Sequence, residues 1–261
     1  MISVVRSLIK PISIIVTLIV SSVVIAQTSS EPPQTGKLTI LITGANRGIG
    51  LALSEKFSTN GFKVIATARK PDEAIELNKL GVQLEALDIS SQASVDTLVA
   101  KLAGQSIDIL LNNAGIGGHS TSNFADLDIN KLAVVLDVNS LGALRVTQGL
   151  LPNLMLGNRR VVASISSRMG SIEDNNRGCC YGYRASKTTL NSFNKSLSME
   201  FEGDGFIFTV LHPGWVKTDM TSDAATYTPK QSSEHLFKVI SGLGKDDNGK
   251  FYDLFGKEIP W

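Results

Sequence analysis

The sequence is poor in cysteine and carries almost no excess charge. Its two cysteines, Cys179 and Cys180, are neighbours in a chain of 261 residues, and a bridge between adjacent residues demands strained geometry. A stabilising disulfide framework is therefore excluded, as is a zinc site built on cysteine pairs. Lysine and arginine number 25 against 24 aspartates and glutamates, which gives a net charge of +1. This balance offers no electrostatic reason to expect a nucleic acid as partner.

Histidine is scarce as well, and the composition excludes a disordered chain. The three histidines, His119, His212 and His235, lack the spacing of metal ligands, so we expect no metal site. Hydrophobic residues make up 43% of the chain and charged residues 19%, unlike the low hydrophobicity and high charge of disordered proteins. A chain of this length can bury a sizeable core, as one large domain or two small ones.

The first 34 residues differ from the rest. Arg6 and Lys10 precede an uncharged apolar run that ends at Ala26, and polar, proline-containing sequence follows. This order is typical of a secretory signal peptide cleaved after Ala26. The run is short for a membrane span, which needs about 20 residues, but an uncleaved anchor or a plain apolar extension would also fit. We expect 1–34 to be a signal peptide or membrane anchor plus polar linker, and 35–261 to form the folded domain.

From Lys37 onward, short apolar runs alternate with helical patterns. Runs that are apolar throughout indicate strands covered on both faces, and hence a parallel sheet. Strand–helix repetition predicts an α/β fold: a single doubly wound (Rossmann-type) domain, with a parallel sheet and helices on both faces. The expected strands are 38–42, 62–66, 82–87, 107–111, 161–165 and 206–211. The expected helices are 49–60, 71–80, 92–103, 130–151, 181–201 and 230–241.

A glycine-rich turn follows the first expected strand. It reads Thr43-Gly44-Ala45-Asn46-Arg47-Gly48-Ile49-Gly50 and runs directly into a helix. Glycines there allow a tight turn and bring backbone N–H groups close to a pyrophosphate, although an ordinary turn can look similar. The spacing Gly-x-x-x-Gly-x-Gly resembles the fingerprint of the short-chain dehydrogenase/reductase family. The resemblance implies that a dinucleotide cofactor is contacted by Gly44, Asn46, Arg47, Gly48, Ile49 and Gly50.

Further motifs of that family follow in the family's order, and the resemblance extends from Lys37 to nearly Trp261. Three of them imply cofactor contacts: Leu87-Asp88-Ile89 at the adenine ring, Asn112-Asn113-Ala114-Gly115 along the cofactor, and His212-Pro213-Gly214-Trp215-Val216 beside the nicotinamide. The resemblance therefore adds eight expected cofactor-binding residues: Asp88, Ile89, Asn113, Ala114, Gly115, Pro213, Gly214 and Val216.

The remaining motifs resemble the family's catalytic residues, which would be Asn139, Ser167, Tyr183 and Lys187. Tyr183 and Lys187 are four residues apart and share one helix face. The ordinary pKa of a phenol, about 10, is too high for proton transfer at neutral pH, so we expect the ammonium to lower it. Both side chains would also contact the cofactor. Ser167 would hydrogen-bond the substrate oxygen as negative charge develops there.

Asn139 has two interpretations. The resemblance implies that it holds a water molecule linking Lys187 to a proton relay. Alternatively, it bonds backbone groups inside a helix, where asparagine is otherwise unfavourable.

The end of the second expected strand bears on the choice of cofactor. Sites specific for NAD place an acid there to hold the ribose 2′-hydroxyl, whereas this strand ends in Ala68-Arg69-Lys70 with no acid before Asp72. Arg69 and Arg47 would instead meet a 2′-phosphate with charge-assisted hydrogen bonds, unless both face solvent. The sequence therefore predicts NADP(H) rather than NAD(H).

Together these features predict an NADP(H)-dependent oxidoreductase that transfers hydride between the cofactor and a small-molecule carbonyl or alcohol. Within the family, the motifs are most similar to those of sniffer-type carbonyl reductases and C-factor-like proteins. An NADP(H)-binding regulatory protein with little turnover is the alternative, and a membrane-tethered scaffold is a third option. We interpret Cys179 and Cys180 as packing or loop residues, with redox sensing as the alternative.

Assembly and location are also predicted from the resemblance and the leader. The resemblance implies a homodimer or homotetramer paired through the long helices, although 130–151 would also suit a buried helix of a monomer. The leader favours membrane association or export, with the cytosol as the alternative because NADPH is expected chiefly inside cells. The two would be reconciled by a lumen that contains NADPH, or by a translation start later than Met1.

Overall fold

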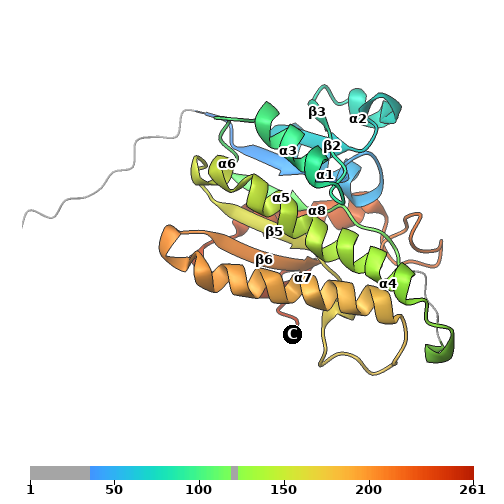
Figure 1. Ribbon diagram of the computed structural model, residues 1–261. Helices are drawn as coiled ribbons and strands as arrows, with labels where there is room; N and C mark the ends of the chain where they lie inside the picture. Colours follow the sequence, from blue (N-terminus) through green and yellow to red (C-terminus); the bar gives the residue numbers. More distant parts are fainter. Residues whose placement is uncertain (1–35, 119–122) are drawn as a thin grey trace, which may run out of the picture. The chain divides into compact units, whose positions relative to one another are not determined.

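The strands form one parallel sheet in the order β3-β2-β1-β4-β5-β6-β7 in the computed structural model (Figure 1). The structure describes residues 36–118 and 123–261. The chain runs from β1 to β2 and β3 on one side and then returns to β4 on the other, so the order reverses between β1 and β4. The predicted doubly wound fold is confirmed. The strands are β1 (Thr39–Ile42), β2 (Lys63–Ala68), β3 (Gln83–Ala86), β4 (Ile109–Asn112), β5 (Val161–Ile165), β6 (Ile207–His212) and β7 (Lys250–Asp253).

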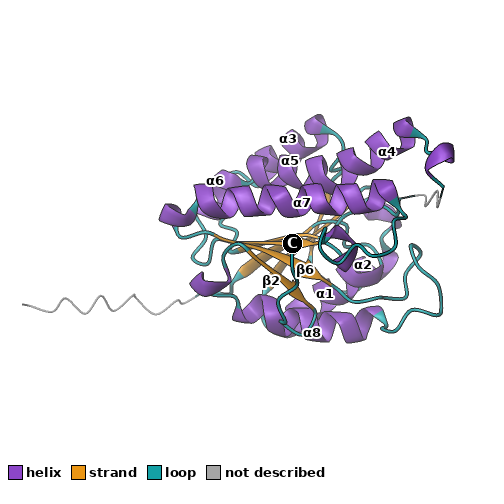
Figure 2. Cartoon of the chain, turned by 90° about the horizontal axis from the view of Figure 1, so that it is seen from below, coloured by secondary structure: helices purple, strands orange, loops and turns teal. Residues whose placement is uncertain are grey.

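Helices cover both faces of the sheet (Figure 2). On one face lie α1 (Gly48–Thr59) and α8 (Pro229–Gly242), which pack against each other. On the other face lie α3 (Gln92–Lys101), α4 (Ile129–Leu136), α5 (Gly142–Gly149), α6 (Leu151–Met155) and α7 (Tyr181–Glu200). This arrangement explains why the strand sequences are apolar on both sides.

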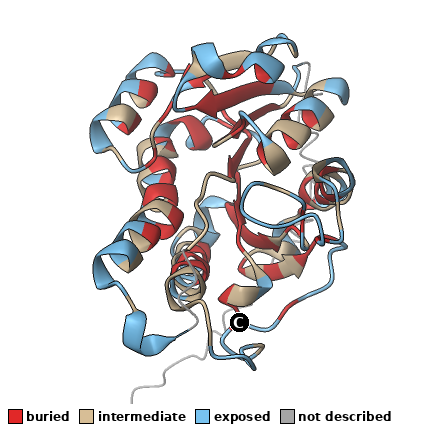
Figure 3. Cartoon of the chain, turned by 90° about the vertical axis from the view of Figure 1, so that its right-hand side faces the viewer, coloured by how far each residue is buried: buried red, intermediate tan, exposed pale blue. Residues whose placement is uncertain are grey.

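The central strand β1 shows how the two faces are filled. Strands of the sheet are buried in the middle of the domain (Figure 3), and all four residues of β1 are buried. Successive side chains point to opposite faces of a sheet. Ile40 and Ile42 join the hydrophobic cluster that contains Phe57 of α1. Leu41 joins the cluster on the other face, with Leu98 of α3.

The predicted helix 71–80 is wrong in extent. Pro71–Glu73 forms a single 3₁₀ turn, and α2 covers only Ile75–Asn78. Between them, Ala74 has φ −87° and ψ 59°, outside the helical region, and its side chain is buried in the core cluster beside α1. The helix predicted over 71–80 is therefore interrupted at Ala74, where the side chain is buried in the core.

The predicted helix 130–151 is helical without a break over 129–149, but it is not regular. A π-helical turn, Asp137–Leu141, separates α4 from α5, and α6 begins only after Leu150. Such turns recur at functional sites, and this one carries Asn139. Next to it, Gly142 lies so close to Ile89 that a Cβ there would stand 2.9 Å from the isoleucine Cδ1.

Strand β7 is missing from the sequence prediction. It reads Lys-Phe-Tyr-Asp, with Phe251 and Asp253 buried and the other two residues half-buried. An alternating four-residue strand at the sheet edge lacks the long apolar run of the central strands. The predicted leader, 1–34, lies outside the described residues, and in the described part of the chain no helix is long and apolar enough to span a membrane.

Candidate active site

A cavity of about 910 Å³ lies at the carboxyl ends of the strands. Open α/β sheets bind ligands at this end, where the strand order reverses, and loops following β1, β3, β4, β5 and β6 contribute to the lining. The structure brings every predicted cofactor-binding residue to this cavity: Gly44, Asn46, Arg47, Gly48, Ile49, Gly50, Arg69, Asp88, Ile89, Asn113, Ala114, Gly115, Tyr183, Lys187, Pro213, Gly214 and Val216.

The glycine-rich turn has the backbone that its sequence demands. Gly44 and Gly48 have φ of 63° and 56°, in the left-handed region that disfavours side chains. A Cβ at Gly50 would stand 2.4 Å from the carbonyl oxygen of Gly44. Helix α1 starts here with Gly-Ile-Gly-Leu, and its N-cap residue Arg47 gives it no side-chain cap within the described residues. Its first backbone N–H groups are thus suited to an anion.

Asn113 holds the glycine-rich turn against β4. Its side-chain Nδ2 donates to the carbonyl oxygens of Thr43 (2.9 Å) and Gly44 (3.0 Å). Its backbone N–H donates to Thr43 Oγ1 at 3.0 Å. The side-chain amide of Asn113, predicted to lie along the cofactor, therefore stabilises the glycine-rich turn.

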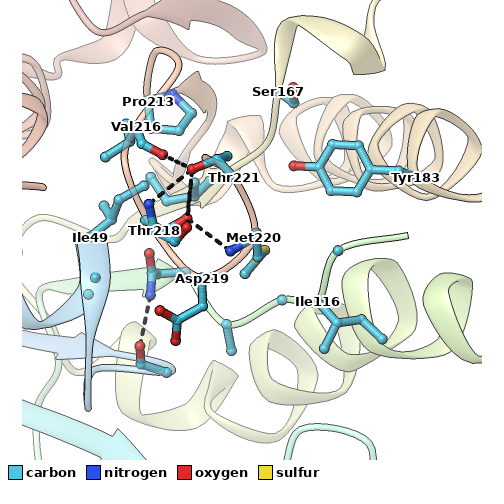
Figure 4. A pocket seen from close by; sticks show the side chains of 18 of the residues that line it. Ile49, Ile116, Ser167, Tyr183, Pro213, Val216, Thr218, Asp219, Met220 and Thr221 are labelled. Atoms are coloured by element: carbon cyan, nitrogen blue, oxygen red, sulfur yellow. Dashed lines mark hydrogen bonds between the residues drawn. The ribbon is translucent and has the colours of Figure 1, made fainter. Parts of the chain in front are cut away.

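Tyr183, on α7, and Ser167, in the turn after β5, both point into the cavity (Figure 4). Ser167 Oγ accepts a hydrogen bond from the backbone N–H of Met169 at 3.2 Å. Burial raises the pKa of Tyr183, and a hydrogen bond with Ser167 opposes the rise. The neighbouring Ser166 instead donates to Asn191 Oδ1 at 2.7 Å inside the core. The hydroxyl of Ser166 therefore has a structural partner, whereas that of Ser167 faces the cavity.

Lys187 is buried one helical turn after Tyr183. Its side chain is 5% exposed, and Nζ donates to the carbonyl oxygen of Ile165 at 2.9 Å. Burial lowers its pKa to about 8. The net pKa of Tyr183 is nevertheless raised, because burial outweighs the lowering that the ammonium was expected to give. Nζ lies over the face of the phenol ring, 5.8 Å from its centroid, and donates away from it.

Asn139 lies behind the cavity wall and is 1% exposed. Its Oδ1 accepts from the backbone N–H of Ile116 (2.8 Å), and its Nδ2 donates to the Ile116 carbonyl (3.0 Å) and to Ser186 Oγ (3.1 Å). The backbone-bonding alternative thus describes the observed contacts. A Cβ at Gly115 would stand 3.1 Å from Asn139 Oδ1 and 3.8 Å from Lys187 Nζ, so both groups lie behind that glycine.

The two arginines expected at a 2′-phosphate differ in their partners. Arg47 Nη1 forms an ion pair with Asp219 Oδ2 at 2.5 Å, and both side chains are exposed. Arg69 stands near Asp88, whose pKa is lowered first by hydrogen bonds from Ser90 and further by the charge of Arg69. Arg69 thus adds positive charge to the end of the cavity where the second and third strands finish.

His212 was given no site role by the sequence, yet it lines the cavity. Its Nδ1 is buried and has no hydrogen-bond partner among the described residues. Burial lowers its pKa to about 4, so the imidazole is neutral at physiological pH. The sequence could have indicated this position, because His212 stands at the carboxyl end of β6, directly before Pro213-Gly214. His119 lies outside the described residues.

Comparison with known proteins agrees with the fold. A family model described as short chain dehydrogenase matches residues 38–228. The C-signal of Myxococcus xanthus is 42% identical over 155 residues, covering 59% of this chain and 93% of that protein. The carbonyl reductase Sniffer of D. melanogaster superposes with a TM-score of 0.82 at 31% identity, covering 87% of this chain and all of that one.

A second solved structure, an NADPH-bound carbonyl reductase from chicken fatty liver, has a TM-score of 0.78 at 31% identity, with 87% of this chain and 100% of that chain covered. The family match spans well over half of the chain, and the structural matches span nearly all of the described domain. The chain therefore belongs to the short-chain dehydrogenase/reductase family.

Proposed function

We propose that this protein is an NADP(H)-dependent oxidoreductase that reduces a carbonyl compound to the alcohol. The observation that carries the proposal is the meeting of Ser167, Tyr183 and Lys187 at one cavity with the glycine-rich turn. Sniffer and the chicken liver enzyme, both named carbonyl reductases, share the fold at 31% identity. The experiment that tests it is a screen of aldehydes, ketones and quinones for NADPH oxidation.

The residues around the cavity fit a phosphorylated dinucleotide. The turn of Gly44 and Gly48 presents the open N-terminus of α1, a ready site for a pyrophosphate. Asp219 engages Arg47, so Arg69 is the guanidinium we assign to the 2′-phosphate, where charge-assisted hydrogen bonds are strong. The chicken liver enzyme is described with bound NADPH, which supports the same cofactor here.

The side chains divide the chemistry of carbonyl reduction among them. Tyr183 keeps its proton at neutral pH because burial raises its pKa, and it gives that proton to the carbonyl oxygen as the carbonyl is reduced. Ser167 donates a hydrogen bond to the same oxygen while negative charge develops on it. Lys187 supplies positive charge over the face of the Tyr183 ring. The nicotinamide supplies the hydride when bound.

Asn139 acts in this scheme as a positioning residue. It fixes the backbone of Ile116 through two hydrogen bonds, and Ile116 lines the cavity. It also bonds Ser186, the residue directly before Lys187. These contacts tie the wall of the cavity to the helix that carries the proton donor.

A regulatory NADP(H)-binding protein with little turnover is the second candidate, and the 42% identity to a protein named C-signal supports it. A pure binder has no need of a proton donor and a paired lysine, which favours the enzyme. The carbonyl screen separates the two candidates. Tight NADPH binding without turnover across the panel would favour the regulator.

The cofactor preference is the first testable prediction. We expect kcat/KM to be higher with NADPH than with NADH, and Arg69→Ala to weaken NADPH far more than NADH, by about 10- to 100-fold for a lost charge-assisted contact. Lys70→Ala is the matched control, because Lys70 pairs with Glu73 at 2.8 Å on the exposed surface. A preference for NADH in the unmodified protein would refute the assignment.

The pH profile is the second prediction. Lys187 has a pKa of about 8 because of its burial, so its ammonium charge is complete below that pH and disappears above it. We expect kcat/KM for carbonyl reduction to be level near neutrality and to fall as the pH rises through about 8. A rate that climbs through this range would contradict the role given to the ammonium.

The role of the leader and the oligomeric state of the domain are proposed as well. We propose that 1–34 directs the folded domain to a membrane or for export, and that the domain forms a homodimer or homotetramer. Sequencing the N-terminus of the mature protein after cell fractionation tests the leader, since a soluble product that begins at Met1 would exclude it. Sedimentation of the domain without the leader tests the oligomer.

A further inference from the structure

Two adjacent thiols stand where the loop after β5 enters α7. The Sγ atoms of Cys179 and Cys180 are 2.8 Å apart, and both cysteines are free and half-buried. Cys180 lines the cavity, three residues before the proposed proton donor Tyr183. The mechanism above uses neither thiol, so their contact has no role in the reaction itself.

The backbone around the pair is held in an unfavourable conformation. Cys180 has φ 61° and ψ 41°, left-handed values that cost energy for a residue with a side chain. Gly178 precedes the pair with φ 60°. Backbone strain of this kind is typical of functional sites. Here it accompanies a conformation in which the two thiols touch.

We propose that Cys179 and Cys180 form a modification site for low-molecular-weight disulfides, which convert the two thiols into a vicinal disulfide and switch off the neighbouring active site. The site goes beyond the proposed function, and its effect on turnover rests on that function.

The exchange consumes one small disulfide for each bridge. The thiolate of one cysteine attacks a sulfur of the small disulfide, and one small thiol leaves with the proton. The second cysteine then attacks the mixed disulfide, and the second small thiol leaves. Two protein thiols are oxidised and one small disulfide is reduced to two thiols. Burial raises the pKa of Cys180, so we assign the first attack to Cys179.

The bridge would be reversible because of its geometry. Consecutive Cα atoms lie about 3.8 Å apart, below the usual disulfide range of about 4.4 to 6.8 Å. Strained disulfides are easily reduced and are the labile, regulatory ones. Such a bond therefore suits a switch, whereas it would serve poorly as a structural link.

Closing the bridge would disturb the first turn of α7. The backbone N–H of Arg184 donates to the Cys180 carbonyl at 2.9 Å, and its Nε donates to the Cys179 carbonyl at 3.1 Å. The Cys179 carbonyl belongs to the Cys179–Cys180 peptide bond, which becomes part of the small ring, and the Cys180 carbonyl is attached directly to that ring. On the other side, Gly118 packs so closely that a Cβ there would stand 2.8 Å from Tyr183 N. Movement of this turn therefore reaches Tyr183.

The test treats the full-length, reduced protein with glutathione disulfide and follows both intact mass and NADPH-dependent carbonyl reduction. We expect the mass to fall by two hydrogen atoms without a glutathione adduct. Turnover should fall by about 100-fold, the scale of loss when a reacting group is displaced by about 1 Å. Dithiothreitol should restore both. Free thiols after treatment, or a bridged protein with unchanged turnover, would overturn the proposal.

Cys179→Ser is the matched control, because Cys179 lies outside the residues that line the cavity. This variant should keep the turnover of the reduced protein and lose the dithiothreitol-reversible bridge. Failure of the proposed function is distinguishable, since reduced protein would then show no turnover while the mass measurement still reports whether the bridge forms.

Discussion

Tyr183→Phe should lower kcat for carbonyl reduction by about 10²- to 10⁴-fold, the usual contribution of a positioned proton donor. The substitution removes one hydroxyl from a buried ring and leaves the glycine-rich turn untouched. NADPH affinity should therefore fall far less than kcat, as measured by fluorescence titration. Equal losses of NADPH binding and turnover would instead indicate that the ring only shapes the cofactor site.

Tyr181→Phe is the control for this substitution. Tyr181 lies on the same helix two residues earlier and packs edge-on against Phe124, with ring centroids 5.8 Å apart. Four residues after it stands Ala185, so it has no lysine partner. We expect Tyr181→Phe to keep nearly full activity. A loss as large as that of Tyr183→Phe would contradict the assignment of the proton donor.

Lys187→Met should lower kcat/KM by about 10²- to 10³-fold, the scale measured for removing one electrostatic group from an active site. Methionine has a similar length and removes the buried charge. We expect the melting temperature to stay the same or rise, so that the loss of activity cannot be attributed to unfolding. The alkaline fall near pH 8 should also disappear from the residual activity. A variant that melts lower and keeps its activity would contradict the account.

The sign of the stability effect follows from the direction of the pKa shift. Lys187 has a folded pKa of about 8 against an ordinary value of 10.5, so the folded state disfavours the charged form. Below pH 8 the lysine is charged in both states, and its burial costs roughly 3 kcal/mol. Between pH 8 and 10.5 the unfolded state binds more protons, so stability rises with pH there. Methionine removes this cost at neutral pH.

The parts of the fold and site set by local sequence were predicted well. Continuous apolar runs such as Val161–Ile165 define strands whose bounds match the structure, because both faces of the sheet are buried. The glycine-rich turn was identified because its glycine spacing resembles the family fingerprint, and the structure gives positive φ to Gly44, before α1, and to Gly48, its first residue. Tyr183 and Lys187 were identified from their resemblance to the family's catalytic pair, and their four-residue separation places both on one helix face. Each of these features depends on a few consecutive residues.

Features that depend on distant residues were missed. The ion pair of Arg47 with Asp219 joins positions 172 residues apart, and no local pattern reports it. The rise in the pKa of Tyr183 reflects burial in the assembled fold, which outweighs what its lysine neighbour suggested. The π turn that carries Asn139 interrupts a sequence that reads as one regular helix. In each case the tertiary environment sets the outcome.

We propose that this chain transfers hydride from NADPH to a carbonyl carbon. The most direct test supplies NADPH deuterated at the transferable position of the nicotinamide, together with a panel of aldehydes and ketones, and analyses the products by mass spectrometry. We predict an alcohol that carries one deuterium on the former carbonyl carbon, formed by the unmodified protein and at least about 10²-fold more slowly by Tyr183→Phe. Tight NADPH binding with no deuterated product across the whole panel would contradict the claim.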